Sequence, residues 1–412
     1  MEDECAMMVE GKDVLGICDT VSLNFNNHKK RITNFDGLGT VSTNKEKVCW
    51  GFLMHPILVL DCQDKTPLGF GGLKLITRPI EPYRSKSNRY RTKNYPIETK
   101  ESIKWLEPCE KSKSNSLLRA NHITFVMDRE GDIMEVYDRL KDAKTDVLVR
   151  AKHNRNIEIA DGSCERLFDF ISNQKVSGNK LVKIVGSKRR HRLAEVDIKF
   201  GSCKLLWHGR QKVSYKNNKT GVRVSIIEVE EKVHRGYANE PKLNWKLITT
   251  KEIKTIEQAK EEIINYEQRW RIEELFKLLK TDGFNVEKTE LQQGKSIRKL
   301  CIMSMNASMK VLQLKAARSG EGKMEVTDIF DEDEIKCLNQ LNEEMSGDTE
   351  KQCNPYDPKH LAWASWIIAR LGGWKGFYDK NRPPGNKTFV WGIQKFESIM
   401  IGFVISKKKD VS

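Results

Sequence analysis

Several features are missing from this sequence, and each absence narrows the classes of protein that fit it. No run of 18 or more apolar residues appears, so we expect neither a membrane-spanning helix nor a membrane partner. The cysteines form no C-x2-C pair, and the histidines show no H-x3-5-H spacing beside cysteines, so a structural zinc site is not expected. The sequence contains no repeat of the kind that forms a solenoid and no long low-complexity tract of the kind that stays disordered.

The start of the chain also lacks a targeting signal. Its first residues, MEDECAMMVEGKD, are acidic and include no apolar stretch of the signal-peptide kind. Disulfide frameworks are typical of small secreted chains, whereas this one has 412 residues and ten scattered cysteines. We therefore expect no signal peptide, reduced thiols and a cytoplasmic location.

Charge is present in excess and unevenly distributed. Lys and Arg number 72 against 57 Asp and Glu, a formal net charge of +15, which favours a polyanionic partner, usually nucleic acid. A basic protein that is merely soluble remains the alternative. Residues 151–220 hold sixteen Lys and Arg against six acids and are predicted to form a contact surface. Residues 325–350 hold ten acids and one Lys, and we expect a solvated face or a linker there.

The hydrophobic pattern predicts an α/β fold. Apolar, β-branched runs predict strands at 14–26, where a hairpin begins, at 47–62, with a break at Pro56, and at 72–79. A strand at 122–128, a helix at 132–142 and a strand at 146–152 predict a β-α-β unit with parallel strands. Short alternating runs with Gly and Asn turns predict a β-rich insertion from about 155 to 250, and helices follow from 255 onward, including 361–374.

Two carboxylates close apolar strands. Asp19 follows VLGIC and Asp128 follows ITFVM. Ligands bind beyond the carboxyl ends of the strands of α/β sheets, and Mg²⁺ favours carboxylates combined with water and phosphate. A lone strand-end Asp is more often a turn residue, but two in one sheet indicate a site for a hard cation.

A third carboxylate lies on a long predicted helix, Thr255 to Lys280. Thr255 and Gln258 form a capping box at its start, and Gly283 is expected to take a left-handed turn after its end. At about 100° per residue, four polar side chains share a stripe of about 60° on this helix. They are Tyr266, Arg269, Glu273 and Lys280. The stripe suits a metal ligand flanked by phosphate-binding groups, although a solvated face with i,i+4 ion pairs has the same spacing.

The stripe also carries a family resemblance. NYEQRWRIEELFKLLK resembles the Tyr-x2-Arg-x3-Glu-x6-Lys signature of the insertion-sequence-four group of DDE transposases, in the branch that includes the transposon-five transposase. ICDTVSL around Asp19 and VMDREGDI around Asp128 resemble the segments that hold the first two catalytic acids of that group. VLVRAKH, KLNWKLITT and LAWASWIIARLGG resemble later landmarks, so the likeness runs from about residue 14 to 374.

The resemblance implies a ribonuclease-H-like catalytic core with a β-rich insertion and a helical C-terminal dimerisation region. On this basis we expect the first part of the core at 1–154, the insertion at 155–250, core helices at 251–320 and the dimerisation region at 321–412. The implied catalytic and metal-binding residues are Asp19, Asp128 and Glu273.

The implied chemistry is cut-and-paste DNA transposition through a hairpin intermediate. Two Mg²⁺ ions, or Mn²⁺ in their place, would assist an in-line displacement at phosphorus. The partners would be double-stranded DNA at the transposon ends and target and a second copy of the chain, with no small-molecule substrate. The location would be the bacterial cytoplasm, in association with the nucleoid.

The resemblance also assigns DNA contacts. Arg269 and Lys280 would hold phosphates, and Tyr266 would contact the phosphate near a flipped base. Trp245 would fill the gap that the base leaves, with a core Trp as its alternative, and Arg150 would contact DNA unless it is an ordinary surface strand residue. The loop 82–95 and the basic run 187–192 are further candidates for backbone contacts.

The sequence departs from the family at its start. Family members carry a helical DNA-binding domain before the first catalytic Asp, whereas 18 residues precede Asp19 here, too few for such a domain. The chain thus resembles an N-terminally shortened member. Two hypotheses follow: a metal-dependent transposase, or an inactive remnant that binds DNA or inhibits the full-length protein by pairing with it. A generic nuclease is disfavoured by the complete Tyr–Arg–Glu–Lys stripe.

Overall fold

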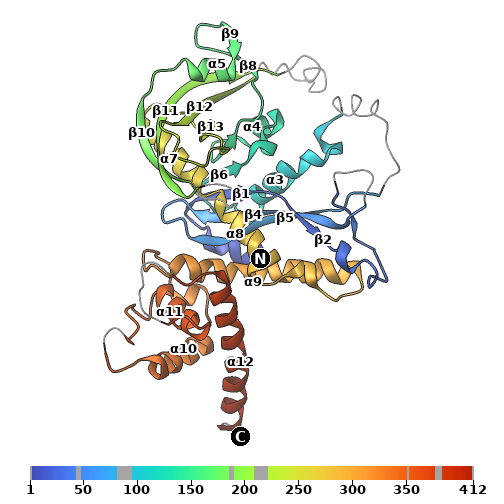
Figure 1. The fold of residues 1–412 in the computed structure, drawn as a ribbon, viewed down its shortest axis with the longest axis vertical. Coiled ribbons are helices and arrows are strands. Elements are labelled where there is room, and N and C mark those ends of the chain that lie inside the picture. The colour runs from blue at the N-terminus through green and yellow to red at the C-terminus, as the bar shows by residue number, and fades with distance from the viewer. Residues whose placement is uncertain are drawn as a thin grey trace.

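The computed structural model describes residues 2–42, 48–80, 95–184, 190–207, 221–349, 352–375 and 383–410. The fold is mixed α/β, with one large sheet and helices packed around it (Figure 1). The strands are β1 Asp13–Cys18, β2 Val21–Asn24, β3 Gly39–Thr40, β4 Trp50–Asp61, β5 Pro67–Ile76, β6 His122–Met127, β7 Thr145–Arg150, β8 Asn156–Glu158, β9 Cys164–Arg166, β10 Gly178–Ile184, β11 Arg192–Leu205, β12 Val222–Glu231 and β13 Asn244–Thr249. The α-helices are α1 Glu2–Met8, α3 Glu107–Ser114, α4 Met134–Leu140, α5 Leu167–Ser172, α7 Ile256–Glu267, α8 Trp270–Lys277, α9 Gly294–Ala317, α10 Glu332–Met345, α11 Leu361–Leu371 and α12 Asn386–Asp410.

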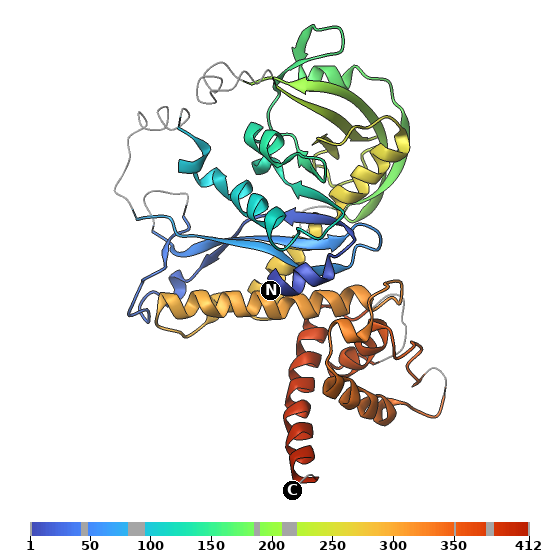
Figure 2. The same ribbon diagram turned by 180° about the vertical axis from the view of Figure 1, so that it is seen from behind.

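The strand order joins two regions that the sequence pattern separates. From β2 the sheet runs β4, β1, β6, β7, β13, β12, β11, β8 and β9, with β3 and β5 paired to β4 and β10 paired to β11. Strands β1, β6 and β7 are mutually parallel, which confirms the predicted β-α-β unit. Strand β13 pairs antiparallel with β7, so the β-rich segment continues the same sheet, curving away above it in Figure 2.

The strand that leads to Asp19 is interrupted at that residue. Cys18 faces Ile57 and Val21 faces Met54 across β4, so β1 and β2 keep one register on either side of Asp19 and Thr20. This register sets Asp19 opposite Pro56, which has no N–H to donate to a neighbouring strand. The predicted break at Pro56 was therefore wrong for β4, which runs on through this residue. The interruption falls in the partner strand instead, at Asp19 and Thr20.

The predicted helix from Thr255 to Lys280 is divided in the structure. Its capping box is confirmed, because the Thr255 hydroxyl accepts from the Gln258 N–H and the Gln258 side chain accepts from the Thr255 N–H. Helix α7 ends at Glu267, α8 begins at Trp270, and Leu278–Asp282 forms a π-turn. The expected left-handed turn at Gly283 was wrong, since its φ is −163°, and Asn285 takes the left-handed conformation instead.

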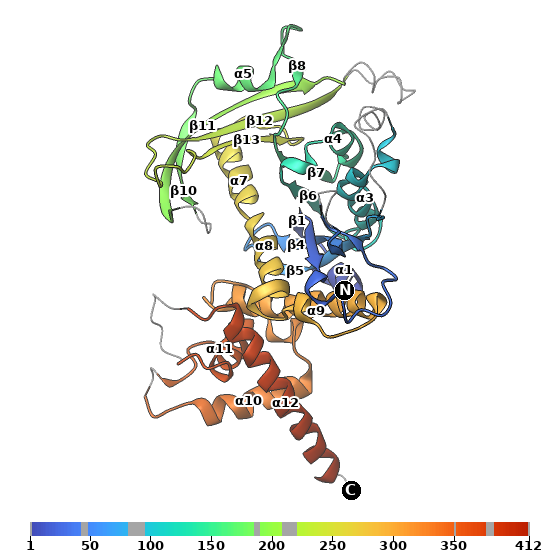
Figure 3. The same cartoon turned by 45° about the vertical axis from the view of Figure 1, so that its right-hand side comes forward.

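The C-terminal helices pack under the sheet and then leave it. Helix α9 contacts β5, and α11 and α12 both pack against α9. The two last helices approach closely: a Cβ on Gly392 of α12 would lie 1.9 Å from the Ile368 carbonyl oxygen of α11. Beyond this contact α12 projects from the body (Figure 3).

Helix α12 is also more apolar than the sequence pattern indicated. Its stretch Asn386–Ile405 has a mean hydropathy of 1.3, so its length and composition alone would allow it to cross a membrane. The half near the body is packed in protein, with Phe389 and Phe396 fully buried, whereas Ile401 and Ile405 are more than half exposed. One such helix is weak evidence for a membrane protein.

The basic stretch differs from its expected role, whereas the acidic stretch forms a helix with a solvated acidic face, one of the two roles expected for it. In 151–220, described cations are engaged in internal ion pairs, among them Arg155 with Asp132, Arg192 with Glu231 and Lys180 with Glu267. The acidic stretch forms α10, which buries Cys337, Leu338 and Leu341 and is not a linker.

Candidate active site

The three predicted acids come from separate parts of the sheet and from a helix beside it. Asp19 follows β1, Asp128 follows the neighbouring parallel strand β6, and Glu273 lies in the first turn of α8. Because β1 and β6 are adjacent and parallel, their carboxyl ends meet at the same edge of the sheet. All three side chains are partly exposed.

Arg269 joins two of these acids directly. Its Nη1 donates to Asp19 Oδ2 at 3.0 Å and its Nη2 donates to Glu273 Oε1 at 2.5 Å. The side chains of Arg269, Asp19 and Glu273 are 20%, 19% and 29% exposed, so the two ion pairs are only partly open to water. Arg269 therefore contacts its predicted i,i+4 neighbour Glu273 and also Asp19, which lies 250 residues earlier in the chain.

The electrostatics show that Asp128 belongs to the same neighbourhood. The pKa of the Asp19 carboxyl is raised from 3.8 to about 6: burial is the largest cause, Arg269 and the N–H of Thr20 oppose it, and the charges of Asp128 and Glu273 add to it. Like charges this close are costly unless a cation balances them. In the structure, Arg269 is a cation that performs this role for Asp19.

A buried histidine that sequence reasoning missed supports the Asp19 segment. Thr20 Oγ1 and His55 Nδ1 share a hydrogen bond of 2.9 Å. Burial, with Lys104 and Lys74 adding to it, lowers the pKa of His55 from 6.5 to about 3, so its ring is neutral at physiological pH. The signal was the position of His55 beside Pro56, opposite the interruption in the neighbouring strand.

Beside the acids lies a hollow of about 240 Å³ with an aromatic and cationic lining. Trp245 and Tyr266 meet edge to face with ring centroids 5.3 Å apart. Arg150 donates to the Asn244 carbonyl oxygen at 3.2 Å and hydrogen-bonds the Tyr266 side chain. Burial raises the pKa of Tyr266, so its phenol stays protonated. The further lining residues are Lys183, Ile184, Leu243, Glu267, Arg269 and Trp270. Four predicted DNA-contact residues thus line one hollow.

Other predicted contact residues are placed elsewhere. Lys280 pairs with Glu287 at 3.3 Å rather than with the three acids. Arg192, from the basic run 187–192, is buried in ion pairs with Glu231 and Glu240, so it was wrongly predicted as a surface contact. Two parts of these predicted contacts lie outside the described residues: 187–189 of the basic run and 82–94 of the loop.

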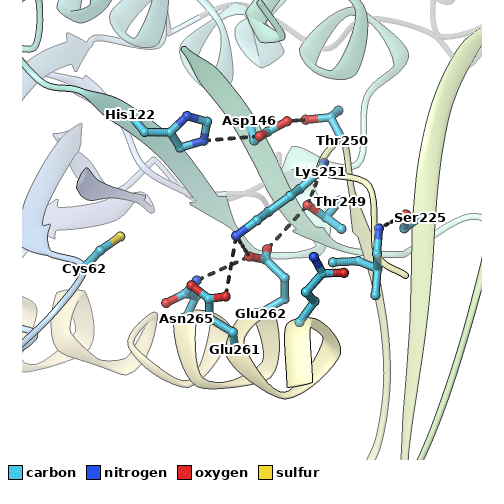
Figure 4. Close-up of polar contacts among 12 residues, drawn as sticks. Cys62, His122, Asp146, Ser225, Thr249, Thr250, Lys251, Glu261, Glu262 and Asn265 are labelled. Carbon is cyan, nitrogen blue, oxygen red and sulfur yellow. Dashed lines mark hydrogen bonds and ion pairs between the residues drawn. The ribbon is translucent and has the colours of Figure 1, made fainter. Parts of the chain in front are cut away.

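A second polar cluster, around Glu262, fixes the helix that carries Tyr266 (Figure 4). Glu262 of α7 is fully buried and receives hydrogen bonds of 3.4 Å from Thr249 and 3.5 Å from Lys251. Asn265 donates to Glu262 at 3.4 Å and accepts from Lys65 at 2.9 Å. A charged residue on the buried face of an amphipathic helix was the available sequence signal. The cluster ties α7 to β13 and to the turn between β4 and β5.

The carboxylates have the chemistry of a Mg²⁺ site but not its arrangement. Hard oxygen ligands are those that Mg²⁺ prefers. Across the described ranges, however, no group of three or more His, Cys, Asp or Glu side chains is arranged to hold a metal ion. In this structure the guanidinium of Arg269 instead binds one carboxylate oxygen of Asp19 and one of Glu273.

Comparison with known families agrees with the class of enzyme that this site indicates. The family model described as "Transposase DDE domain" matches residues 106–309. The matched segment includes Asp128 and the whole stripe from Tyr266 to Lys280, while Asp19 precedes it. Over this segment the chain is similar to the DDE domain of transposases.

Among solved structures, the chain is similar to a piggyBac transposase in a synaptic complex with hairpin DNA. The identity is 7%, the TM-score is 0.35, and the alignment covers 77% of this chain and 51% of the other. The chain thus spans about half the length of that protein, and a likeness this weak adds nothing to the description of the site.

Proposed function

We propose that this protein is a DDE transposase that cleaves DNA at transposon ends and joins it to a target by metal-dependent transesterification. The observation that carries the proposal is the convergence of Asp19, Asp128 and Glu273 at one edge of the sheet, with Arg269 between two of them. The strand order β5, β4, β1, β6, β7, with its first three strands antiparallel, is that of a ribonuclease-H-like core, which supports the same reading.

The proposed roles follow from the chemistry of each group. Asp19, Asp128 and Glu273 would hold two Mg²⁺ ions, which activate the attacking oxygen and stabilise the leaving oxygen when bound. Arg269 would hold a phosphate of the DNA backbone, and the hollow lined by Trp245 and Tyr266 would receive an unstacked base. Lys280 would reach DNA only by exchanging Glu287 for a phosphate.

The proposal includes a homodimer. Its contact surface is expected on α12 and not on the apolar helix at 361–374 that the sequence indicated. Helix α11 is buried within its own chain from Leu361 to Ala369. Among the described residues of the predicted dimerisation region 321–412, the large apolar side chains that stay exposed lie on α12, among them Trp391, Ile401 and Ile405. We expect the double variant Ile401→Glu/Ile405→Glu to sediment as a monomer at concentrations where the wild type self-associates. A wild type that stays monomeric with DNA would contradict this.

The cleavage assay tests the function. We expect the purified chain to nick a supercoiled plasmid that carries the DNA flanking its gene, with Mg²⁺ and not with EDTA. Glu273→Ala should lose this activity by at least about a hundredfold, because a missing ligand removes the transition-state stabilisation that the metal supplies. Glu257→Ala, which removes an exposed carboxylate from the first turn of α7, is the matched control and should keep full activity.

Equal nicking by the wild type and Glu273→Ala would reject the catalytic assignment. DNA binding without nicking in the wild type would favour the alternative, an inactive chain that binds DNA or pairs with an active copy.

A further inference from the structure

We propose that Arg269 is an exchangeable counter-ion, which blocks the metal site in the free protein and opens it when DNA is bound. The inference rests on the proposed function and adds a form of regulation to it. Its basis is the pair of contacts that one guanidinium makes, to Asp19 at 3.0 Å and to Glu273 at 2.5 Å.

The first step of the argument is competition for oxygens. A Mg²⁺ ion is bound through one or two carboxylates and keeps near-ideal octahedral geometry, so it needs the ligand oxygens within about 2.1 Å. The guanidinium forms charge-assisted hydrogen bonds to the same carboxylates. While Arg269 donates to Asp19 Oδ2 and Glu273 Oε1, a metal ion cannot take these two oxygens as ligands in the same place.

The second step is the new partner that Arg269 has within reach. Its side chain also lines the 240 Å³ hollow, together with Arg150, Lys183 and Trp245. Arg150 and Lys183 make this hollow cationic, which favours a phosphate there. Arg269 is the N-cap residue of α8, and its side chain has the acids on one side and the hollow on the other. Guanidinium binds phosphate and carboxylate with similar geometry, so the exchange preserves its hydrogen bonds.

The consequence is linkage between two ligands. DNA that draws Arg269 away would free Asp19 and Glu273 for metal, and metal that displaces Arg269 would free it for phosphate. Such coupling is reciprocal, because each ligand changes the affinity of the other by the same factor. Metal without DNA would then bind weakly, and cleavage chemistry would be assembled only on the substrate.

The test measures Mn²⁺ affinity, from the electron paramagnetic resonance signal of free Mn²⁺, with and without a short DNA duplex at constant salt. We expect Arg269→Ala to bind Mn²⁺ on the order of tenfold more tightly than the wild type without DNA. DNA should tighten Mn²⁺ binding by the wild type by a similar factor and leave Arg269→Ala unchanged. Arg271→Ala, which removes an equal charge paired with Glu274 on the same helix, should behave like the wild type.

The opposite sign would overturn the inference. If Arg269 only positions Asp19 and Glu273 as ligands, Arg269→Ala will bind Mn²⁺ less tightly than the wild type, or equally. Nicking that depends on Glu273 together with this result would reject the exchange and leave the proposed function standing. Absence of Mn²⁺ binding in every variant, with or without DNA, would reject both.

Discussion

Trp245 illustrates how a single side chain acquires a role only through its neighbours. In the sequence it lies in a predicted strand, where either a role beside a flipped base or simple packing in the core fits a Trp. In the structure it is partly exposed, packs edge to face on Tyr266 and lines a cationic hollow. That setting favours base stacking over simple core packing.

We expect Trp245→Ala to weaken binding of DNA that contains an unpaired nucleotide. Stacking of one base on an aromatic side chain contributes about 1–3 kcal/mol, which corresponds to a loss of about 5- to 150-fold. Binding of a fully paired duplex should change much less. Fluorescence anisotropy with the two DNAs measures this, and Met303→Ala, at an exposed apolar position of α9, is the control. An equal loss on both DNAs would contradict a stacking role.

The candidate acids could be predicted from the sequence, but the link between them could not. Asp19 and Asp128 each follow an apolar strand, and Glu273 lies in a helical stripe, but this spacing alone also fitted turn residues and a solvated face, and the family resemblance favoured the three acids. The ion pair of Arg269 with Asp19 spans 250 residues of chain. Local pattern carries no information about such a contact, because it depends on where the helix packs against the sheet.

At the scale of elements, internal ion pairs account for charges that the sequence assigned to a surface. Arg192 of β11 is hydrogen-bonded through Nε and Nη2 to both oxygens of Glu231 on β12, at 2.9 and 3.0 Å. The Leu243 N–H also donates to Glu231, at 3.0 Å. Burial would raise the pKa of Glu231, but these hydrogen bonds lower it from 4.5 to about 2. A basic sequence stretch thus serves the packing of neighbouring strands.

Removing this carboxylate should destabilise the sheet. We expect Glu231→Ala to lower the free energy of unfolding by on the order of 3 kcal/mol at pH 7, because it leaves Arg192 with one fewer buried partner. The folded pKa lies below the unfolded one, so this contribution is present above pH 4.5 and is lost as the pH falls toward 2. Urea unfolding measures it, with Glu195→Ala, an exposed carboxylate on β11, as the control. A difference between wild type and variant that does not shrink below pH 4.5 would contradict the account.

Element types were more predictable than their ends. The β-α-β unit and the capping box at Thr255 depend on local periodicity and local hydrogen bonds, and both are confirmed. The division of the long helix near Gln268 and the extended backbone at Gly283 depend on packing against the sheet and α9. Pro56 is a further example. The sequence predicted a break in its own strand, but the break lies in the neighbouring strand, between β1 and β2.

At the scale of the whole molecule, the sheet edge, helices α7 and α8, and the α7 cluster around Glu262 form one connected support for the site. Strand β13 carries Trp245, and its end residue Thr249 binds Glu262, while α7 carries Tyr266. Movement of the β-rich segment relative to β1 would therefore change the hollow and the acids together.

The most direct test of the central claim is anomalous diffraction at the manganese edge, from crystals of the protein grown with Mn²⁺ and a DNA duplex. The account predicts manganese peaks coordinated jointly by the carboxylates of Asp19, Asp128 and Glu273, with the Arg269 guanidinium turned to a DNA phosphate. Manganese bound elsewhere, while Arg269 still bridges Asp19 and Glu273 in the DNA complex, would contradict it.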